Sequence, residues 1–216
     1  LSKKNNIKTQ YNTFQPNNIN INRLACTYQD SNQIILMIGN QTCSNSSHEY
    51  LYLKVLESHL SYGMSSLLFK LFREKNGLTY DVGVFNPFRQ QNSPFLIYLS
   101  VSNGNALLAF KILIKLWKNL VSKLISEKEI NLAKVKLRSS LLISSQNLDE
   151  ILQRRIQLIG NDLDPDFDMN CVNKIEEINS ENILEVSKKY FSKPFLSIYG
   201  NEKICNEINE LWIKNF

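Results

Sequence analysis

The chain has 216 residues, of which 43% are hydrophobic, and its formal net charge at pH 7 is +5. This hydrophobic content suffices for a substantial core and excludes a chain that is disordered throughout. No apolar run approaches the ~20 residues of a membrane-spanning helix, and the N-terminus lacks the charged, apolar and small-residue order of a signal peptide. The first residue is leucine, which is consistent with a segment of a longer chain.

The four cysteines are widely spaced, and no CxxC pair or cysteine-histidine cluster is present in the sequence. This spacing predicts neither a disulfide framework nor a thiolate metal site. We therefore expect free thiols in a reducing compartment and a cytoplasmic protein. The residues are Cys26, Cys43, Cys171 and Cys205.

Residues 1–20 are rich in asparagine, lysine and glutamine and show little periodicity, which predicts a mobile arm or the remainder of a linker. Residues 21–216 are expected to form one domain. Two strand-like runs lie between Ile21 and Asn40, and the second, Gln33–Gly39, has the apolar character of a buried strand. Ser46 and Glu49 have the spacing of a capping box, which predicts a helix that continues to about Leu60.

A short helix, a glycine stop and a strand are predicted in immediate succession between Gly63 and Phe85. Gly77 can adopt the left-handed conformation that ends a helix. Arg73 in the last helical turn and Tyr80 at the start of the strand are then held on either side of one tight corner, where both can reach one ligand. The buried face of the helix is expected to carry Leu67, Leu68, Leu71 and Phe72.

Both corner residues also have a purely structural interpretation. Arg73 can pair with Glu74 or with the helix dipole, and Tyr80 can be an ordinary aromatic residue of an edge strand. Ser65 and Ser66 precede the same helix, whose free N–H groups can bind a carbonyl or an anion, although capping is the simpler role.

The remaining pattern alternates strands with amphipathic helices. Phe95–Ser102 is predicted to be a strand paired antiparallel with the strand near Tyr80. Phe85, Phe88 and Arg89 lie near the tip of this hairpin, where they either face a partner or form a satellite cluster. Further helices are predicted at 106–122, at 126–142 from a second capping box at Ser126–Glu129, at 147–159 after a bend at Ser144–Ser145, at 176–190 and at 201–212, with a strand at 195–199.

The helix at 106–122 carries lysines on one side and apolar residues, Leu108 among them, on the other. A solvated outer face over a core explains this pattern. The alternative is an anionic membrane or a nucleic acid, whose binding would fall steeply with salt. We expect neither as a partner. The lysines on the helix are Lys111, Lys115 and Lys118, and Lys123, which directly follows it, would join them in such binding.

The stretch GMSSLLFKLFREKNGLTY, residues 63–80, resembles a signature in the C-terminal half of the M16 peptidases, the family of insulin-degrading enzyme, pitrilysin and the mitochondrial processing peptidase. The resemblance implies that Arg73 and Tyr80 bind a substrate peptide, with the tyrosine hydroxyl near the carbonyl under attack. One position departs from the signature, because Leu67 replaces its usual arginine. ISEKEINLAKVKLRSSL and IEEINSENILEVSKKYF before FLSIYGN also resemble the family, in the same order, so the likeness covers about residues 20–200.

Zinc in this family is bound through an HxxEH motif on a helix. The sequence contains only two histidines, His48 and His59, and neither is in an HxxEH frame. They lie eleven positions apart on one predicted helix, about 16 Å along its axis, so they are not expected to share a metal. We expect surface or capping roles for both, no metal in this chain, and zinc in a partner half only.

These observations predict an α+β domain with a mixed, mostly antiparallel sheet covered by helices, which is the fold that the resemblance implies. The chain would be the zinc-free half of a zinc metalloendopeptidase, inactive alone, closing over a peptide held by a metal-bearing half on the same polypeptide or on a separate subunit. The alternative function is a non-catalytic scaffold or assembly subunit of the same lineage. A homodimer is a further arrangement that the sequence leaves open.

Overall fold

The computed structural model describes residues 23–144 and 147–216 and has the predicted α+β architecture. Five strands form one sheet in the order β1-β5-β2-β4-β3. Only β1 and β5 run parallel, and the other neighbours are antiparallel. The strands are β1 (Leu24–Tyr28), β2 (Gln33–Gln41), β3 (Asp81–Phe85), β4 (Pro94–Ser102) and β5 (Phe195–Gly200).

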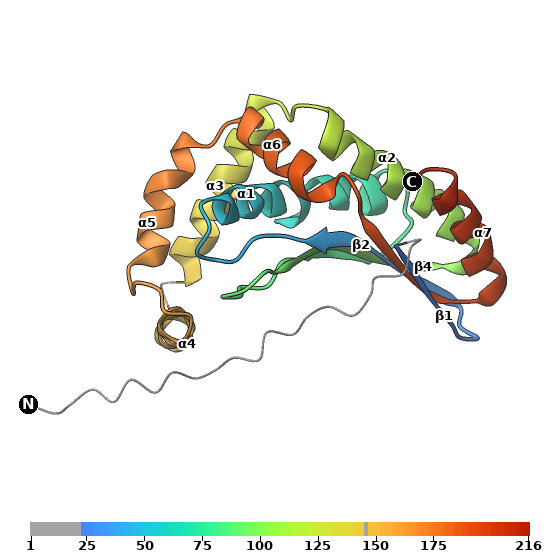
Figure 1. Ribbon diagram of the computed structural model, residues 1–216, viewed down its shortest axis with the longest axis horizontal. Coiled ribbons are helices and arrows are strands. Elements are labelled where there is room, and N and C mark those ends of the chain that lie inside the picture. Colours follow the sequence, from blue (N-terminus) through green and yellow to red (C-terminus); the bar gives the residue numbers. More distant parts are fainter. Residues whose placement is uncertain (1–22, 145–146) are drawn as a thin grey trace, which may run out of the picture.

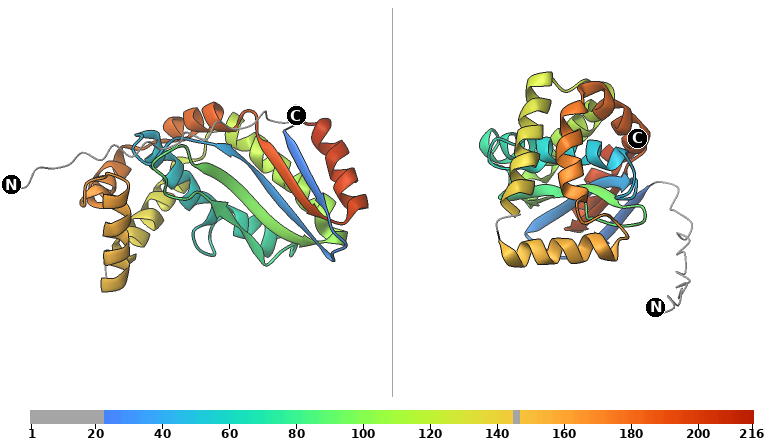
Figure 2. Two further views of the ribbon diagram at one scale, coloured as in Figure 1. Left: turned by 60° about the horizontal axis from the view of Figure 1, so that its bottom comes forward. Right: turned by 90° about the vertical axis from the view of Figure 1, so that its left-hand side faces the viewer.

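The helices gather along one face of the sheet and around one of its ends (Figure 1). Helices α1, α2, α6 and α7 lie along that face, whereas α3, α4 and α5 stand at one end, with α4 extending past the sheet (Figure 2). Their bounds are α1 (Glu49–Ser61), α2 (Ala106–Ser122), α3 (Glu127–Ser144), α4 (Leu148–Gly160), α5 (Phe167–Lys174), α6 (Ser180–Phe191) and α7 (Glu202–Ile213), with short helices η1 (Phe69–Glu74), η2 (Asn103–Asn105) and η3 (Ile175–Glu177). Among the described residues, no helix is both long and apolar enough to cross a membrane.

The core lies between the sheet and the helices of its covered face. Alternate residues of the central strands, such as Ile34 and Leu36 of β2, are fully buried there because strand side chains alternate between the two faces. At its centre, Trp117 of α2 packs against Phe191 of α6 with ring centroids 5.0 Å apart, and its indole N–H donates to the Phe191 carbonyl at 2.9 Å. On the opposite face, side chains such as Met37 of β2 and Tyr199 of β5 are exposed.

Several predicted elements are confirmed. The strand pair β3–β4 is antiparallel, and α2 has the predicted bounds. The second capping box is present, since the Ser126 hydroxyl and the Glu129 carboxylate each engage the backbone N–H of the other residue. The arm predicted at residues 1–20 and the bend at residues 144–145 lie outside or at the margin of the described residues. The single domain at residues 21–216 stays a prediction.

Other predictions are wrong in detail. The Ser46–Glu49 box does not form: α1 has no side-chain cap, and the Glu49 carboxylate instead binds Lys189 at 2.7 Å. The helix predicted at 176–190 begins at Ser180, because Asn179 and Asn182 cap it reciprocally. Leu108, expected in the core, is 50% exposed. Helix α5 after Pro165 was not predicted.

Candidate functional site

The predicted corner begins at η1, whose turns are of the π type. The Lys75 N–H donates to the carbonyl of Lys70, five residues earlier, at 3.0 Å. Gly77 then adopts a φ of 57° and donates to the Arg73 carbonyl at 3.1 Å. This left-handed conformation favours glycine, as predicted. Phe72 is fully buried beneath the turn, so the corner is fixed to the core.

Thr79 anchors the far side of the corner. Its hydroxyl donates to the carbonyl of Ser100 on β4 and accepts from the Asp81 N–H at 3.0 Å. Strand β3 begins at Asp81, so Tyr80 lies just before the strand and not within it as predicted. The backbone of Tyr80 is therefore held between two anchored residues while its side chain points to solvent.

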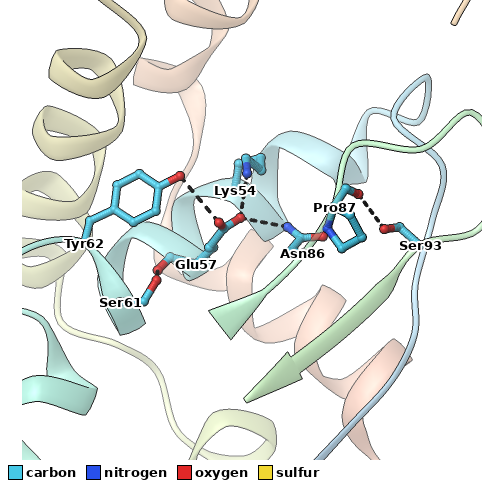
Figure 3. A network of polar contacts seen from close by, with 7 residues as sticks. All are labelled: Lys54, Glu57, Ser61, Tyr62, Asn86, Pro87 and Ser93. Carbon is cyan, nitrogen blue, oxygen red and sulfur yellow. Dashed lines mark hydrogen bonds and ion pairs between the residues drawn. The ribbon is translucent and has the colours of Figure 1, made fainter. Parts of the chain in front are cut away.

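A buried carboxylate holds the other end of β3. Glu57 of α1 is 8% exposed, pairs with Lys54 at 2.7 Å and accepts from the side-chain amide of Asn86 at 2.9 Å (Figure 3). Asn86 directly follows β3. Because these groups are largely removed from water, they depend on each other for hydrogen bonds. The network therefore fixes β3, and with it the corner, against α1.

Replacing Glu57 with alanine should lower the free energy of unfolding by about 3 kcal/mol, because the Lys54 ammonium and the Asn86 amide lose their shared partner. Urea unfolding measures this change. The control is Glu176→Ala, which breaks an exposed pair with Arg138 at 3.8 Å and should cost less than about 0.5 kcal/mol. Equal losses in the two variants would contradict the proposed role of Glu57.

The structure brings Arg73 and Tyr80 together. The Arg73 guanidinium carbon lies 5.3 Å from the centre of the Tyr80 ring and 5.0 Å from that of Phe69. Tyr80 is 89% exposed and Arg73 is also exposed. Within the described residues, Arg73 forms no ion pair, so the predicted alternative of pairing with Glu74 is not observed. The sequence analysis missed Phe69, although its position one turn before Arg73 is a usable signal.

The described residues do not fit a zinc site. His48 is exposed at the start of α1, and His59 is half-buried near its end. Burial lowers the pKa of His59, so its expected surface role is wrong. Across the described residues, no group of three or more histidine, cysteine, aspartate or glutamate side chains is placed to hold a metal ion.

The weaker candidates are the two serines before the helix and the three residues near the hairpin tip. Ser66 is buried, and neither it nor Ser65 caps η1 through its side chain. Phe88 packs against the main core and not in a separate satellite cluster, with its ring centroid 5.7 Å from that of the buried Tyr50. The guanidinium carbon of Arg154 lies 4.2 Å from the centre of the Phe88 ring. Phe85 is 46% exposed, and Arg89 is exposed.

The family model described as "Peptidase M16 inactive domain" matches residues 1–137. The chain belongs to the M16 peptidase family. Its similarity to an uncharacterized zinc protease of Rickettsia felis amounts to 29% identity over 171 residues, which is 76% of this chain and 40% of that protein. The M16 chain described here thus spans about two fifths of the length of this curated relative.

Solved structures share the fold of this M16 chain. A crystal structure of a peptidase M16 inactive domain from Pseudomonas fluorescens aligns with a TM-score of 0.71 and 20% identity over 82% of this chain and 43% of that one. A chain of Complex III2 from Candida albicans aligns with a TM-score of 0.66 and 15% identity, over 86% and 49% of the two chains. At these identities, the likeness concerns the fold alone.

Proposed function

We propose that this chain is the zinc-free half of an M16-type peptidase and binds a substrate peptide beside a metal-bearing half. The match to the M16 inactive domain supports descent from an M16 peptidase. The name of the Rickettsia felis relative supports zinc-dependent proteolysis by the complete protein. Hydrolysis is assigned to the metal-bearing half, since the residues described here do not form a metal site.

The observation that carries the proposal is the exposed pair formed by Arg73 and Tyr80 on an anchored corner. The guanidinium carbon of Arg73 lies 5.3 Å from the centre of the Tyr80 ring. The guanidinium can donate two hydrogen bonds to a peptide carbonyl or to a carboxylate. The phenol can donate to an oxygen on which negative charge develops during attack, which is worth most when the donor is held in place. The π-type turn of η1 adds support, because such turns are frequent at functional sites.

Strand β3 gives the peptide a second means of attachment. Among the described strands, β3 pairs only with β4, so it is an edge strand of the sheet. The Asp81 N–H is bound by the Thr79 hydroxyl, but the outward-facing N–H and C=O groups further along this edge can accept an extended peptide as an added strand. Main-chain pairing along β3 would bring the peptide alongside the corner.

The test is a peptidase assay on the complete protein, or on this chain mixed with a separately produced metal-bearing half. A fluorogenic peptide should be cleaved only when both halves are present, and a zinc chelator should abolish cleavage. This chain alone should be inactive. Cleavage by the metal-bearing half at an unchanged rate without this chain would contradict the proposal.

A second candidate function is a non-catalytic scaffold or assembly subunit of the M16 lineage. The structural likeness to a chain of Complex III2 from Candida albicans favours it. The same assay separates the two functions, because a scaffold subunit would bind its partner in size-exclusion chromatography without supporting cleavage by any combination of halves.

A further inference from the structure

A groove of about 600 Å³ lies on the outer surface, between α2 and the helical turn that precedes the corner. One row of α2 forms its apolar wall, and Leu67 and Leu71 lie across from it. The row is Leu108, Ile112, Leu116 and Leu120, whose spacing of four residues places them on successive turns of one helix face. The volume falls within the range of small-molecule sites.

A polar row borders the apolar wall. Lys115, Asn119 and Lys123 also line the groove and again follow each other at intervals of four residues. Within the described part of the chain, neither lysine ammonium forms an ion pair or a hydrogen bond, whereas the neighbouring Lys118 donates to the Asn215 side chain at 2.8 Å. The four lysines of this region therefore do not form one uniform basic patch, and two of them face the groove with free charges.

The other polar groups of the groove add one negative charge, which the two lysine charges exceed. The Glu129 carboxylate, the one acidic group among the lining residues, is bound by the Ser126 hydroxyl at 2.6 Å in the cap of α3. His59 is half-buried near it. An anionic head group therefore meets net positive charge beside Lys115 and Lys123.

Large apolar side chains at the groove are left in water. Leu108 is 50% exposed and Leu124 is 57% exposed. Covering them with a hydrocarbon chain is favourable in proportion to the apolar area removed from water. The α2 residues that line the groove run from Leu108 to Leu120, a rise of about 18 Å, so the groove extends along the helix as an apolar trough.

We propose that this groove binds a fatty acid, with the alkyl chain along the apolar row and the carboxylate on the ammonium group of Lys115 or Lys123. The side-chain amide of Asn119, between the two lysines, can donate to the same carboxylate. A charge-assisted hydrogen bond of this kind is stronger than a neutral one. The apolar trough selects for a single hydrocarbon chain, and the two free cations select for an anionic head group.

The test is isothermal titration calorimetry of this chain with dodecanoate, below the concentration at which dodecanoate forms micelles. We expect saturable binding of one dodecanoate, and at least tenfold weaker binding of dodecyltrimethylammonium, which has the same tail and the opposite charge. The double variant Lys115→Glu/Lys123→Glu should weaken dodecanoate binding at least tenfold. The control Lys111→Glu changes an exposed lysine of the same helix that does not line the groove, and it should leave binding unchanged.

Three outcomes would overturn the proposal. The first is absence of dodecanoate binding, and the second is equal binding of the anionic and cationic amphiphiles. The third is sedimentation of the chain with phosphatidylglycerol vesicles that Lys111→Glu weakens as much as the double variant does, because a membrane surface would then be the ligand. Circular dichroism confirms that the variants fold, which is expected because all three lysines are exposed.

Discussion

Replacing Tyr80 with phenylalanine should lower the kcat for peptide hydrolysis by the assembled peptidase about 100-fold, with little change in KM. The proposed contribution of this residue is a hydroxyl that donates to the oxygen of the carbonyl under attack, and loss of one such donor typically has this effect. Phenylalanine keeps the ring against which the Arg73 guanidinium lies, so the change removes the hydroxyl alone. Steady-state kinetics with a fluorogenic peptide measures both constants.

The control for this prediction is Tyr199→Phe. Tyr199 lies on β5, is 38% exposed and has no assigned role in peptide binding. Its variant should retain the kcat of the unmodified protein. A Tyr80→Phe variant with the same kcat as Tyr199→Phe would show that the hydroxyl of Tyr80 does not act on the substrate.

Replacing Trp117 with alanine should lower the free energy of unfolding by about 4 kcal/mol, the typical cost of removing a large aromatic side chain from a core. Trp117 is fully buried and joins α2 to α6 through both its ring and its N–H group. For a chain of this size, the loss corresponds to a fall in Tm of about 10 °C. Thermal unfolding followed by circular dichroism measures it.

Trp117→Phe is the matched control for the core variant. It keeps an aromatic ring beside Phe191 and loses the hydrogen bond of the indole N–H, so it should cost about 2 kcal/mol, roughly half as much as alanine. A loss below about 1 kcal/mol for Trp117→Ala would mean that the junction of α2 and α6 contributes little to stability.

The fold was predictable from the sequence where local chemistry and burial agree. Gly77 follows η1, which ends at Glu74, and has the predicted positive φ, because glycine adopts that conformation without steric cost. The seven-residue separation of Arg73 and Tyr80 then brings the two side chains together. The π-type turn of η1, which contains Arg73, was not predictable, because apolar spacing over so few residues does not distinguish five-residue from four-residue hydrogen bonding.

Two of the wrong predictions have causes that lie outside the local sequence pattern. Glu49 has the right spacing for a capping box with Ser46, but its carboxylate binds Lys189, which is 140 residues away. A local pattern contains no information about that partner. Leu108 likewise follows the apolar period of α2 and is still half exposed, because the helix opens there onto the groove.

The central claim is that the corner of Arg73 and Tyr80 contacts the substrate peptide. Its most direct test is photo-cross-linking of a biotinylated substrate peptide, in the presence of chelator, to benzoylphenylalanine placed at position 80 of the assembled peptidase. We predict that the peptide becomes attached to this chain and that unlabelled peptide competes with this attachment. The same group at position 28, on β1 at the opposite edge of the sheet, should give no attachment. Absence of attachment at position 80, or equal attachment at position 28, would contradict the claim.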